Sequence, residues 1–513
     1  MTLDPREEPN SDRSASVSGC EEEKPGESRG RLLKKTGSIC PRCLEDVSAT
    51  VRERDGEVWM DKRCPEHGEF SALLSSASRH YYRALENPPG SAACCGSACG
   101  APDPSAGALP DSGPWANHSC TVLIEIIERC NLTCPTCFAG SSPQHEGLMS
   151  LETFTHRVQR LAQGGKTGAD MIQLSGGEPT IHPRLPEMLD LLFENGFKQV
   201  TINSNGIKLA QADYVRRLAA CAARWPGAQL FVYLQFDGFD ERTQETLRGR
   251  RDLLEIKRRA ILNCQSNGIS VHPVMTLTRG INEHEVGDFV RLAVDNPQLK
   301  NVVIQPAMYS GRYDNPRHQD RITLADTVRL ICDQFGTFEA DDFGPIPCSD
   351  PNCFGMAVAF RTSSGLVPVS RYFPPYETWN DEEARPLIEE FADTINGPDA
   401  LSAALRWAAG SGDEGGVLEE LGDDQVEALL DALVAAQSGD GDLWDRLLTI
   451  SIKPFMDAWT YDQDRIDACC VHILDPDGEP VSFCEYNAVR RPRLDGSARP
   501  GNREAAAIQV IDA

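Results

Sequence analysis

Apolar residues in the middle of the chain form short runs separated by stretches with helical spacing. Six runs have the length of buried strands: residues 121–127, 170–174, 199–202, 230–236, 270–277 and 301–304. After the first run, Leu151, Phe154, Val158 and Leu161 recur on one face of a helix. Strands that alternate with helices predict βαβ units and a parallel sheet. The pattern favours an α/β fold with a partial (β/α)6 barrel, and a doubly wound open sheet is the main alternative.

The segments on either side of this barrel region (residues 119–312) have a different character. Residues 1–30 are rich in Ser, Glu, Asp, Pro and Gly and are predicted to be disordered. Residues 31–118 form a Cys-rich module whose tail, residues 88–114, is loop-like. Residues 313–513 form a C-terminal region with an acidic helical insertion near residues 385–450.

Composition narrows the classes of partner. The 513 residues carry a net charge of −27, and such a surface repels the phosphates of nucleic acid. It also argues mildly against anionic membranes, so we expect no nucleic-acid partner and at most peripheral membrane contact. No apolar run reaches the length of a membrane span, and none near Met1 reads as a secretory signal. A cytoplasmic protein is the expectation.

The 19 cysteines favour metal or cluster binding over disulfides, because thiols stay reduced in that compartment. Cys130, Cys134 and Cys137 follow the first strand in a C-x3-C-x2-C spacing. Three thiolates can hold three irons of a cubane and leave the fourth iron open for a substrate. A zinc site is the alternative interpretation of the same three residues.

Polar clusters follow the next three strands. Gly176, Gly177 and Glu178 end the second strand, and two glycines let a backbone approach a ligand closely while a carboxylate accepts from an ammonium group. Two further clusters end the third and fourth strands: Asn203 with Ser204, and Gln235. Ligands bind at the carboxyl ends of parallel strands, which favours one shared site. Ordinary turn chemistry is the alternative for residues 203–206.

Together these residues resemble the radical SAM superfamily over about residues 120–310. The resemblance implies that the three cysteines ligate a [4Fe–4S] cluster, that Phe138 packs near the adenine of S-adenosylmethionine (SAM), and that Glu178 binds its amino group. It implies that Asn203, Ser204 and Gln235 bind the ribose and carboxylate. The expected reaction is reductive cleavage of SAM to a 5′-deoxyadenosyl radical that takes hydrogen from an unactivated C–H bond. Alkyl C–H groups have no accessible pKa, so no side chain is predicted as a catalytic acid or base.

A second metal site is predicted near the start of the Cys-rich module. Cys40 and Cys43 form one knuckle, and Cys64 begins another about 20 residues later. This spacing is typical of zinc-ribbon and rubredoxin-like sites for one zinc or iron ion. The fourth ligand is left open between His67 and a cysteine of the group Cys94, Cys95 and Cys99.

A third group of thiols lies late in the chain and predicts an auxiliary [4Fe–4S] cluster. Its members are Cys348, Cys353, Cys469, Cys470 and Cys484. Four thiolates would ligate such a cluster fully, and three would leave an iron open. Buried cysteines without a metal are the alternative.

The outer segments resemble archaeal tetraether lipid synthases, in the two N-terminal knuckles, in residues 455–459 and 469–472, and in residues 480–487. That family implies coupling of two lipid chains between saturated carbons, several clusters and a mononuclear iron. Some relatives were formerly described as pterin methyltransferases. The sequence departs from the family where three spaced cysteines are expected: Cys95 and Cys99 are present, but Ala101, Pro102 and Asp103 hold no third.

Three hypotheses follow. The first is a radical SAM enzyme that couples alkyl chains of a lipid, with an electron donor such as ferredoxin or flavodoxin. The second is a radical SAM methyltransferase or other modifying enzyme acting on a small pterin or a peptide. The third is a non-catalytic multi-cluster electron carrier, against which the Glu178 segment argues.

Overall fold

The computed structural model describes residues 30–81, 119–163, 169, 171–313, 321–346, 349–362, 365–372 and 446–494. The predicted disordered N-terminus and nearly all of the acidic insertion therefore lie outside the described residues. So do three predicted ligands, namely Cys95, Cys99 and Cys348.

A four-stranded antiparallel sheet forms the N-terminal module, and we call it the ribbon. Its strands are β1 (Arg31–Ile39), β2 (Asp46–Arg54), β3 (Glu57–Cys64) and β4 (Gly68–Ser75), in the order β1-β2-β3-β4. Asp55 and Gly56 both have positive φ between β2 and β3, as a tight hairpin turn requires. The other two connections lie at the opposite end of the sheet, and they carry the two cysteine knuckles.

The central sheet has 11 strands among the described residues, and all six predicted strands belong to it. These six are β5 (Thr121–Ile127), β6 (Met171–Gly176), β7 (Gln199–Ser204), β8 (Gln229–Gln235), β9 (Ser270–Leu277) and β10 (Asn301–Pro306). Neighbours from β5 to β10 pair in parallel.

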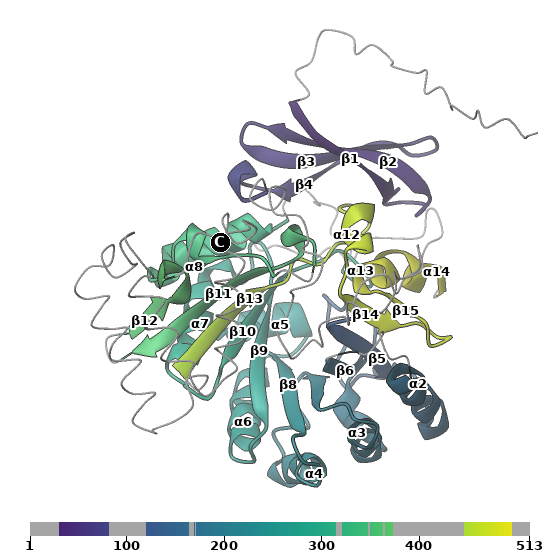
Figure 1. Cartoon of the computed structure of the whole chain (residues 1–513), viewed down its shortest axis with the longest axis vertical. Helices are drawn as coiled ribbons and strands as arrows, with labels where there is room; N and C mark the ends of the chain where they lie inside the picture. The colour runs from purple at the N-terminus through teal and green to yellow at the C-terminus, as the bar shows by residue number, and fades with distance from the viewer. Residues whose placement is uncertain are drawn as a thin grey trace, which may run out of the picture.

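Helices cover the outer face of this sheet (Figure 1). They are α2 (Leu151–Gln163), α3 (Leu185–Glu194), α4 (Ala212–Ala222), α5 (Glu241–Arg248), α6 (Leu253–Gln265), α7 (Val286–Val294) and α8 (Leu324–Phe335). In α2, the predicted face buries Phe154, Val158 and Leu161 in the main core. The side chains on the other face of the strands line a cavity, so the mostly parallel sheet fits a partial barrel and not the doubly wound alternative.

The sheet does not end at residue 312. Two later strands, β13 (Leu447–Ile452) and β14 (Val471–Leu474), pair in parallel with β10 and β5. Three antiparallel strands complete the sheet: β11 (Gly355–Thr362), β12 (Gly365–Pro368) and β15 (Pro480–Ser482). The barrel region was predicted to end at residue 312, whereas the sheet of the structure continues into the C-terminal region. Without β13 and β14, the edges of β10 and β5 would leave backbone N–H and C=O groups unpaired.

Short helical segments complete the structure. They are η3 (Pro179–Ile181), η4 (Glu283–Glu285), η6 (Ala340–Asp342), η7 (Pro351–Cys353), η8 (Val369–Tyr372), α12 (Gln463–Asp467), α13 (Phe483–Glu485), η12 (Tyr486–Arg490) and α14 (Arg491–Leu494). In the part of the chain described, no helix has the length and apolar character that a membrane crossing needs.

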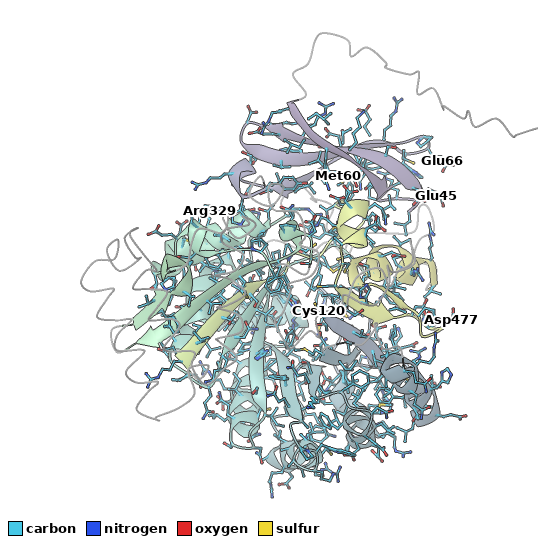
Figure 2. The ribbon with its side chains drawn as sticks, viewed as in Figure 1. Glu45, Met60, Glu66, Cys120, Arg329 and Asp477 are labelled. Atoms are coloured by element: carbon cyan, nitrogen blue, oxygen red, sulfur yellow. The ribbon has the colours of Figure 1, made fainter. Side chains whose placement is uncertain are left out.

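The ribbon packs on the C-terminal segment, where α12 lies against β1 (Figure 1). Ile39 and Leu44 share an apolar cluster with Met456, Tyr461 and Ile466. Figure 2 shows Met60 of β3 on the side of the ribbon that faces this segment. The ribbon and the C-terminal cysteines are therefore neighbours in space although about 400 residues separate them.

Candidate functional site

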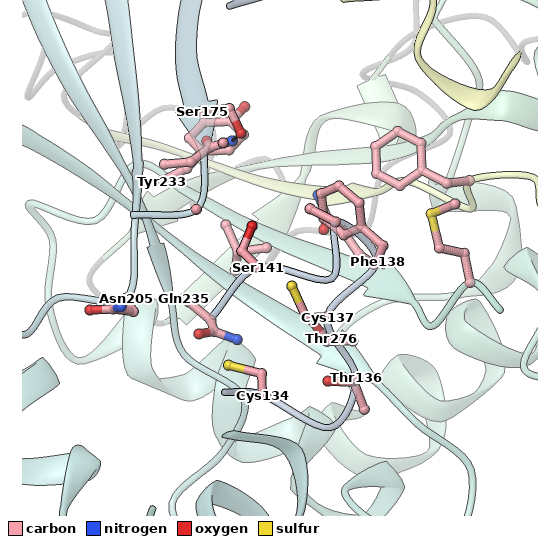
Figure 3. A pocket seen from close by; sticks show the side chains of 18 of the residues that line it. Cys134, Thr136, Cys137, Phe138, Ser141, Ser175, Asn205, Tyr233, Gln235 and Thr276 are labelled. Carbon is pink, nitrogen blue, oxygen red and sulfur yellow. Dashed lines mark hydrogen bonds between the residues drawn. The ribbon is translucent and has the colours of Figure 1, made fainter. Parts of the chain in front are cut away.

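A cavity of about 230 Å³ opens at the carboxyl ends of the parallel strands. All the residues predicted for the central site line it: Cys130, Cys134, Cys137, Phe138, Gly176, Gly177, Glu178, Asn203, Ser204 and Gln235. Figure 3 shows Cys134 and Cys137 on one side of this cavity, with Ser175 and Tyr233 on the other. The structure thus brings together residues from the ends of four strands.

The loop that carries the three cysteines is held by one arginine. Arg312 donates from Nε to the carbonyl of Cys134 at 3.0 Å, and its other nitrogens donate to the carbonyls of Gly140 and Ser141. The neighbouring Gly311 has a φ of +61°, and a Cβ there would lie 2.2 Å from the carbonyl oxygen of Phe138. The residues after β10 therefore fix the shape of the cysteine loop.

Two of the cysteine thiols, those of Cys130 and Cys134, lie in surroundings that oppose ionisation without a bound cation. Burial, and then the charge of Glu178, raise the pKa of Cys130 to about 12. Burial likewise raises the pKa of Cys134. Three thiolates on one wall of a cavity need positive charge between them, and iron supplies it. The donor set and its surroundings fit a [4Fe–4S] cluster.

Two glycines at the end of β6, Gly176 and Gly177, pack the turn that carries Glu178 against the start of the cysteine loop. A Cβ on Gly176 would lie 2.1 Å from the carbonyl oxygen of Ile127, and one on Gly177 would lie 2.1 Å from that of Arg129. The Gly177 N–H donates to the Ile127 carbonyl at 2.6 Å. The glycines were predicted to let the backbone approach a ligand. In the structure they also let the turn pack against the residues that lead into Cys130.

Glu178 is buried and is hydrogen-bonded inside the protein. Oε1 accepts from the backbone N–H and the hydroxyl of Thr180 and, at 2.8 Å, from the hydroxyl of Ser204. Oε2 accepts from the Asn205 N–H at 2.8 Å. Burial raises the pKa of this carboxyl, and the hydrogen bonds oppose that rise. Glu178 therefore fixes the turn after β7 as well as lining the cavity.

The remaining predicted residues also have partners. Asn203 donates from Nδ2 to the Ser175 hydroxyl at 3.1 Å, and Gln235 donates to Asp237 at 3.0 Å. The ring of Phe138 packs edge-on against Phe483, with centroids 5.7 Å apart. These contacts set the orientation of each side chain at the cavity wall before any ligand binds.

Sequence reasoning missed a buried ion-pair network beneath the cysteine loop. Arg248 lines the cavity and donates to both carboxylate oxygens of Asp237, at 2.8 and 2.6 Å. It also donates to Thr136 of the cysteine loop at 3.3 Å. Lys257 lies 3.6 Å from the same carboxylate, and burial lowers its pKa to about 8. Asp237 lies two residues after the end of β8, but its partners Arg248 and Lys257 left no local signal in the sequence.

The ribbon brings Cys40, Cys43, Cys64 and His67 together, with their ligand atoms within 4.8 Å of one another. The Sγ atoms of Cys43 and Cys64 are 3.8 Å apart. Tetrahedral zinc with bonds of about 2.3 Å places two thiolates about 3.8 Å apart, so the geometry fits one such ion. Of the fourth ligands left open by the sequence, His67 is the one in this cluster, while Cys94, Cys95 and Cys99 lie outside the described residues.

Three of the late cysteines lie near enough to one another to interact, and one of them, Cys484, packs against the apolar cluster that the ribbon shares. Cys353, Cys469 and Cys484 interact electrostatically with one another, and burial raises the pKa of each. Arg465 donates from Nε to the Cys353 thiol at 3.3 Å. Cys470 is buried beside β5, where its carbonyl accepts from the Thr121 N–H. Three predicted ligands are therefore grouped, and their auxiliary cluster stays a prediction.

Comparison with known proteins is consistent with this geometry. Residues 124–293 match the model of the radical SAM superfamily, and residues 32–76 match that of the HMPTM N-terminal zinc ribbon domain. The chain is 29% identical over 504 residues to the 7,8-dihydro-6-hydroxymethylpterin dimethyltransferase of Methanocaldococcus jannaschii. That match covers 90% of this chain and 95% of the relative.

Two further similarities are partial. The chain is 28% identical to the Fe-coproporphyrin III synthase of Methanosarcina barkeri, over 41% of this chain and 49% of that protein. Among solved structures, Streptococcus suis SuiB bound to precursor peptide SuiA overlaps 42% of this chain and 45% of its own. Its identity is 18% and its TM-score is 0.34.

Proposed function

Because residues 124–293 form a radical SAM domain and the chain is a radical SAM superfamily enzyme, we propose that it abstracts hydrogen from an unactivated C–H bond of an alkyl substrate in the cavity. One observation carries this proposal. The three cysteines, the Glu178 turn and the polar ends of β7 and β8 share a single cavity.

Each side chain then has a task that its place in the cavity supports. Cys130, Cys134 and Cys137 hold a [4Fe–4S] cluster, which when bound supplies the electron that cleaves the sulfonium of SAM. Glu178 accepts from the SAM ammonium group. Asn203, Ser204 and Gln235 hold the polar ribose and carboxylate. Phe138 covers the adenine and keeps water away from it.

An apolar wall next to the cysteine loop supports an alkyl substrate. Five of the cavity residues form it: Leu123, Met308, Phe455, Val471 and Phe483. Saturated chains gain about 25 cal/mol per Å² when they leave water for such a surface. We therefore propose that the reaction couples alkyl chains of a lipid, as the resemblance of the outer segments implies. Each of the two carbons that join gives one hydrogen to a 5′-deoxyadenosyl radical, so two SAM molecules are cleaved for each new C–C bond.

A second function rests on a different observation. The relative that matches 90% of this chain is named a dimethyltransferase of a dihydropterin. Methyl transfer to a dihydropterin takes one carbon from a methyl donor such as SAM and adds it to the substrate, and it joins no chains. Product mass separates the two reactions.

The proposal is tested by anaerobic reconstitution with iron and sulfide, followed by incubation with SAM, a reductant and either dialkylglycerol lipids or 6-hydroxymethyl-7,8-dihydropterin. We expect 5′-deoxyadenosine and a lipid product whose mass shows coupling with loss of hydrogen. A methylated pterin would favour the second function instead. Full iron loading without 5′-deoxyadenosine would favour an electron carrier and exclude both.

The Cys134→Ala variant tests the cluster ligand directly. We expect it to release no 5′-deoxyadenosine and to keep the metal of the ribbon, because the ribbon ligands lie elsewhere. Cys264→Ala is the matched control, since Cys264 is buried in the main core away from the cavity. Cleavage of SAM by the Cys134 variant at the rate of the control would remove this cysteine from the cluster.

A further inference from the structure

One charged side chain in the cavity has no role in the reaction described above. Lys453 directly follows β13, where its backbone N–H donates to the Ile304 carbonyl at 2.9 Å. Its half-buried side chain lines the cavity that also holds the cysteine loop. The strand pairing therefore fixes a primary amine at the wall of the reaction chamber.

The charge of Lys453 is not neutralised by the surrounding protein. Within the described ranges, no ion pair and no side-chain hydrogen bond involves its ammonium group. The ammonium lies 5.8 Å from the ring centre of Tyr233 and 5.3 Å from that of Phe354. Aromatic faces hold a cation in place but do not cancel its charge. Arg248, the cation beneath the cysteine loop, is by contrast paired with Asp237.

A second polar atom without a partner among the described residues belongs to His272 of β9. His272 precedes Val274 and Thr276 by two and four positions on β9, and the period of a strand puts all three on one face. Its Nδ1 is buried and, among the described residues, has no hydrogen-bond partner. Its ring packs against Phe231 and Tyr233, with centroids 5.4 and 5.5 Å away. Burial, and then the charge of Lys453, lower the pKa of His272 to about 4, so no second positive charge is present there.

The sheet order places this lysine away from the residues proposed for SAM. Glu178 and Ser204 follow or end β6 and β7, whereas Lys453 follows β13. Strands β8, β9 and β10 lie between β7 and β13 in the sheet. Asn203, Ser204 and Gln235, which also line the cavity, are the residues proposed for the ribose and carboxylate of SAM. An anion beside Lys453 is therefore best placed on the other reactant.

We infer that Lys453 binds an anionic phosphate group of the substrate inside the barrel. The inference rests on the proposed function, because it specifies which alkyl substrate the cavity takes. The phosphate fixes one end of the molecule at the β10–β13 wall, and the apolar wall beside the cysteine loop receives the chain. A charged group held in this way determines which carbon faces SAM.

The experiment compares a dialkylglycerol phosphate with the uncharged dialkylglycerol of the same chains. Equilibrium binding is measured on the reconstituted enzyme with SAM present. We expect the wild type to bind the phosphate form about ten- to a hundred-fold more tightly, as one charge-assisted hydrogen bond allows. Lys453→Gln should lose this preference and Lys453→Arg should retain most of it. Lys208→Gln is the control, because Lys208 also lies over a tyrosine ring, 5.3 Å from Tyr214, but does not line the cavity.

Two results would overturn the inference. One is a phosphate preference that survives in Lys453→Gln. The other is a loss of SAM affinity in that variant without a change in lipid preference, which would assign the lysine to the SAM carboxylate.

A separate measurement distinguishes failure of the anion site from failure of the lipid substrate. Lysine acetylation is followed by mass spectrometry with and without inorganic phosphate. Slower acetylation of Lys453, but not of Lys208, supports the anion site even if neither lipid binds, and in that case the lipid substrate is wrong. Lipid binding with no protection of Lys453 and no phosphate preference leaves the proposed function standing and rejects the anion site.

Discussion

At the scale of single residues, Glu178 combines an observed structural task with the binding task that we propose for it. Its motif predicts contact with an ammonium group, and the structure adds hydrogen bonds to Thr180, Ser204 and Asn205. A buried carboxylate costs free energy unless such donors surround it. The carboxylate therefore orders the turn after β7 without any ligand. If it also binds SAM as proposed, substitutions here should affect both folding and binding.

The Glu178→Gln variant should show both effects. Its amide nitrogen cannot accept a hydrogen bond from the Asn205 N–H, so we expect a loss of about 1–3 kcal/mol in the free energy of unfolding. Affinity for SAM should fall as well, because the negative charge is gone. Thr180→Val is the control, since it removes one donor to Glu178 and keeps the carboxylate. If both variants bind SAM as the wild type does, Glu178 has only the structural task. Unfolding curves and equilibrium SAM binding provide the measurements.

Residue types at strand ends were predictable because their motifs are local in sequence. Arg248 and Lys453 were not, because what distinguishes them is the presence or absence of a partner. The carboxylate that pairs with Arg248 is 11 residues away, and the rings beneath Lys453 belong to β8 and to the segment before β11. Charge balance in a cavity depends on tertiary contacts that a sequence pattern does not show.

At the scale of elements, the cysteine loop depends on the segment after β10. The guanidinium of Arg312 donates to three carbonyls of this loop, and the backbone N–H of Arg312 donates to the Cys137 carbonyl at 3.0 Å. A loop with several unpaired carbonyls would not hold three thiols in one arrangement without such a donor. The arginine therefore preorganises the cluster site although it provides no ligand.

Arg312→Gln should weaken the cluster without removing a cysteine. Loss of hydrogen bonds from a charged donor is expected to cost about 1.5–3 kcal/mol, and iron should leave the reconstituted protein faster when a chelator is added. Iron release is followed by absorbance. The control is Arg224→Gln, because Arg224 forms an exposed pair with Asp190 on the outer helices. Equal rates of iron loss in the two variants would show that the clamp is unimportant for the cluster.

The strands β5 to β10 were predictable because each is an apolar run that ends in a polar cluster. The structure places their ends within two residues of most predicted limits. The strands β13 and β14 were not predicted as parts of the barrel. They have six and four residues, and their partners β10 and β5 lie far away in the chain. Short apolar runs carry no information about which distant edge they complete.

At the scale of the whole molecule, the ribbon and the C-terminal cysteines are coupled through one interface. Ser38 of β1 donates to the Tyr461 carbonyl at 2.6 Å, and Lys62 of β3 donates to the Ala458 carbonyl at 2.7 Å. Lys34 pairs with the buried Asp462 at 2.8 Å. These contacts lie between the ribbon metal site and the segment that leads to Cys469. The metal of the ribbon should therefore stabilise both parts.

Removal of one ribbon ligand tests this coupling. Cys43→Ala leaves only three of the four ligands of the ribbon site. We therefore expect the metal content to fall by one ion per chain. Metal binding contributes directly to the folding of small metal domains, so β1–β4 should exchange amide hydrogen faster. The interface predicts that residues 456–466 exchange faster too, although no residue there is a ligand. Glu66→Ala is the control, because Glu66 is exposed in the same knuckle next to His67 (Figure 2). Faster exchange confined to the ribbon would show that the metal stabilises the ribbon alone, and the C-terminal cysteines would then be independent of it.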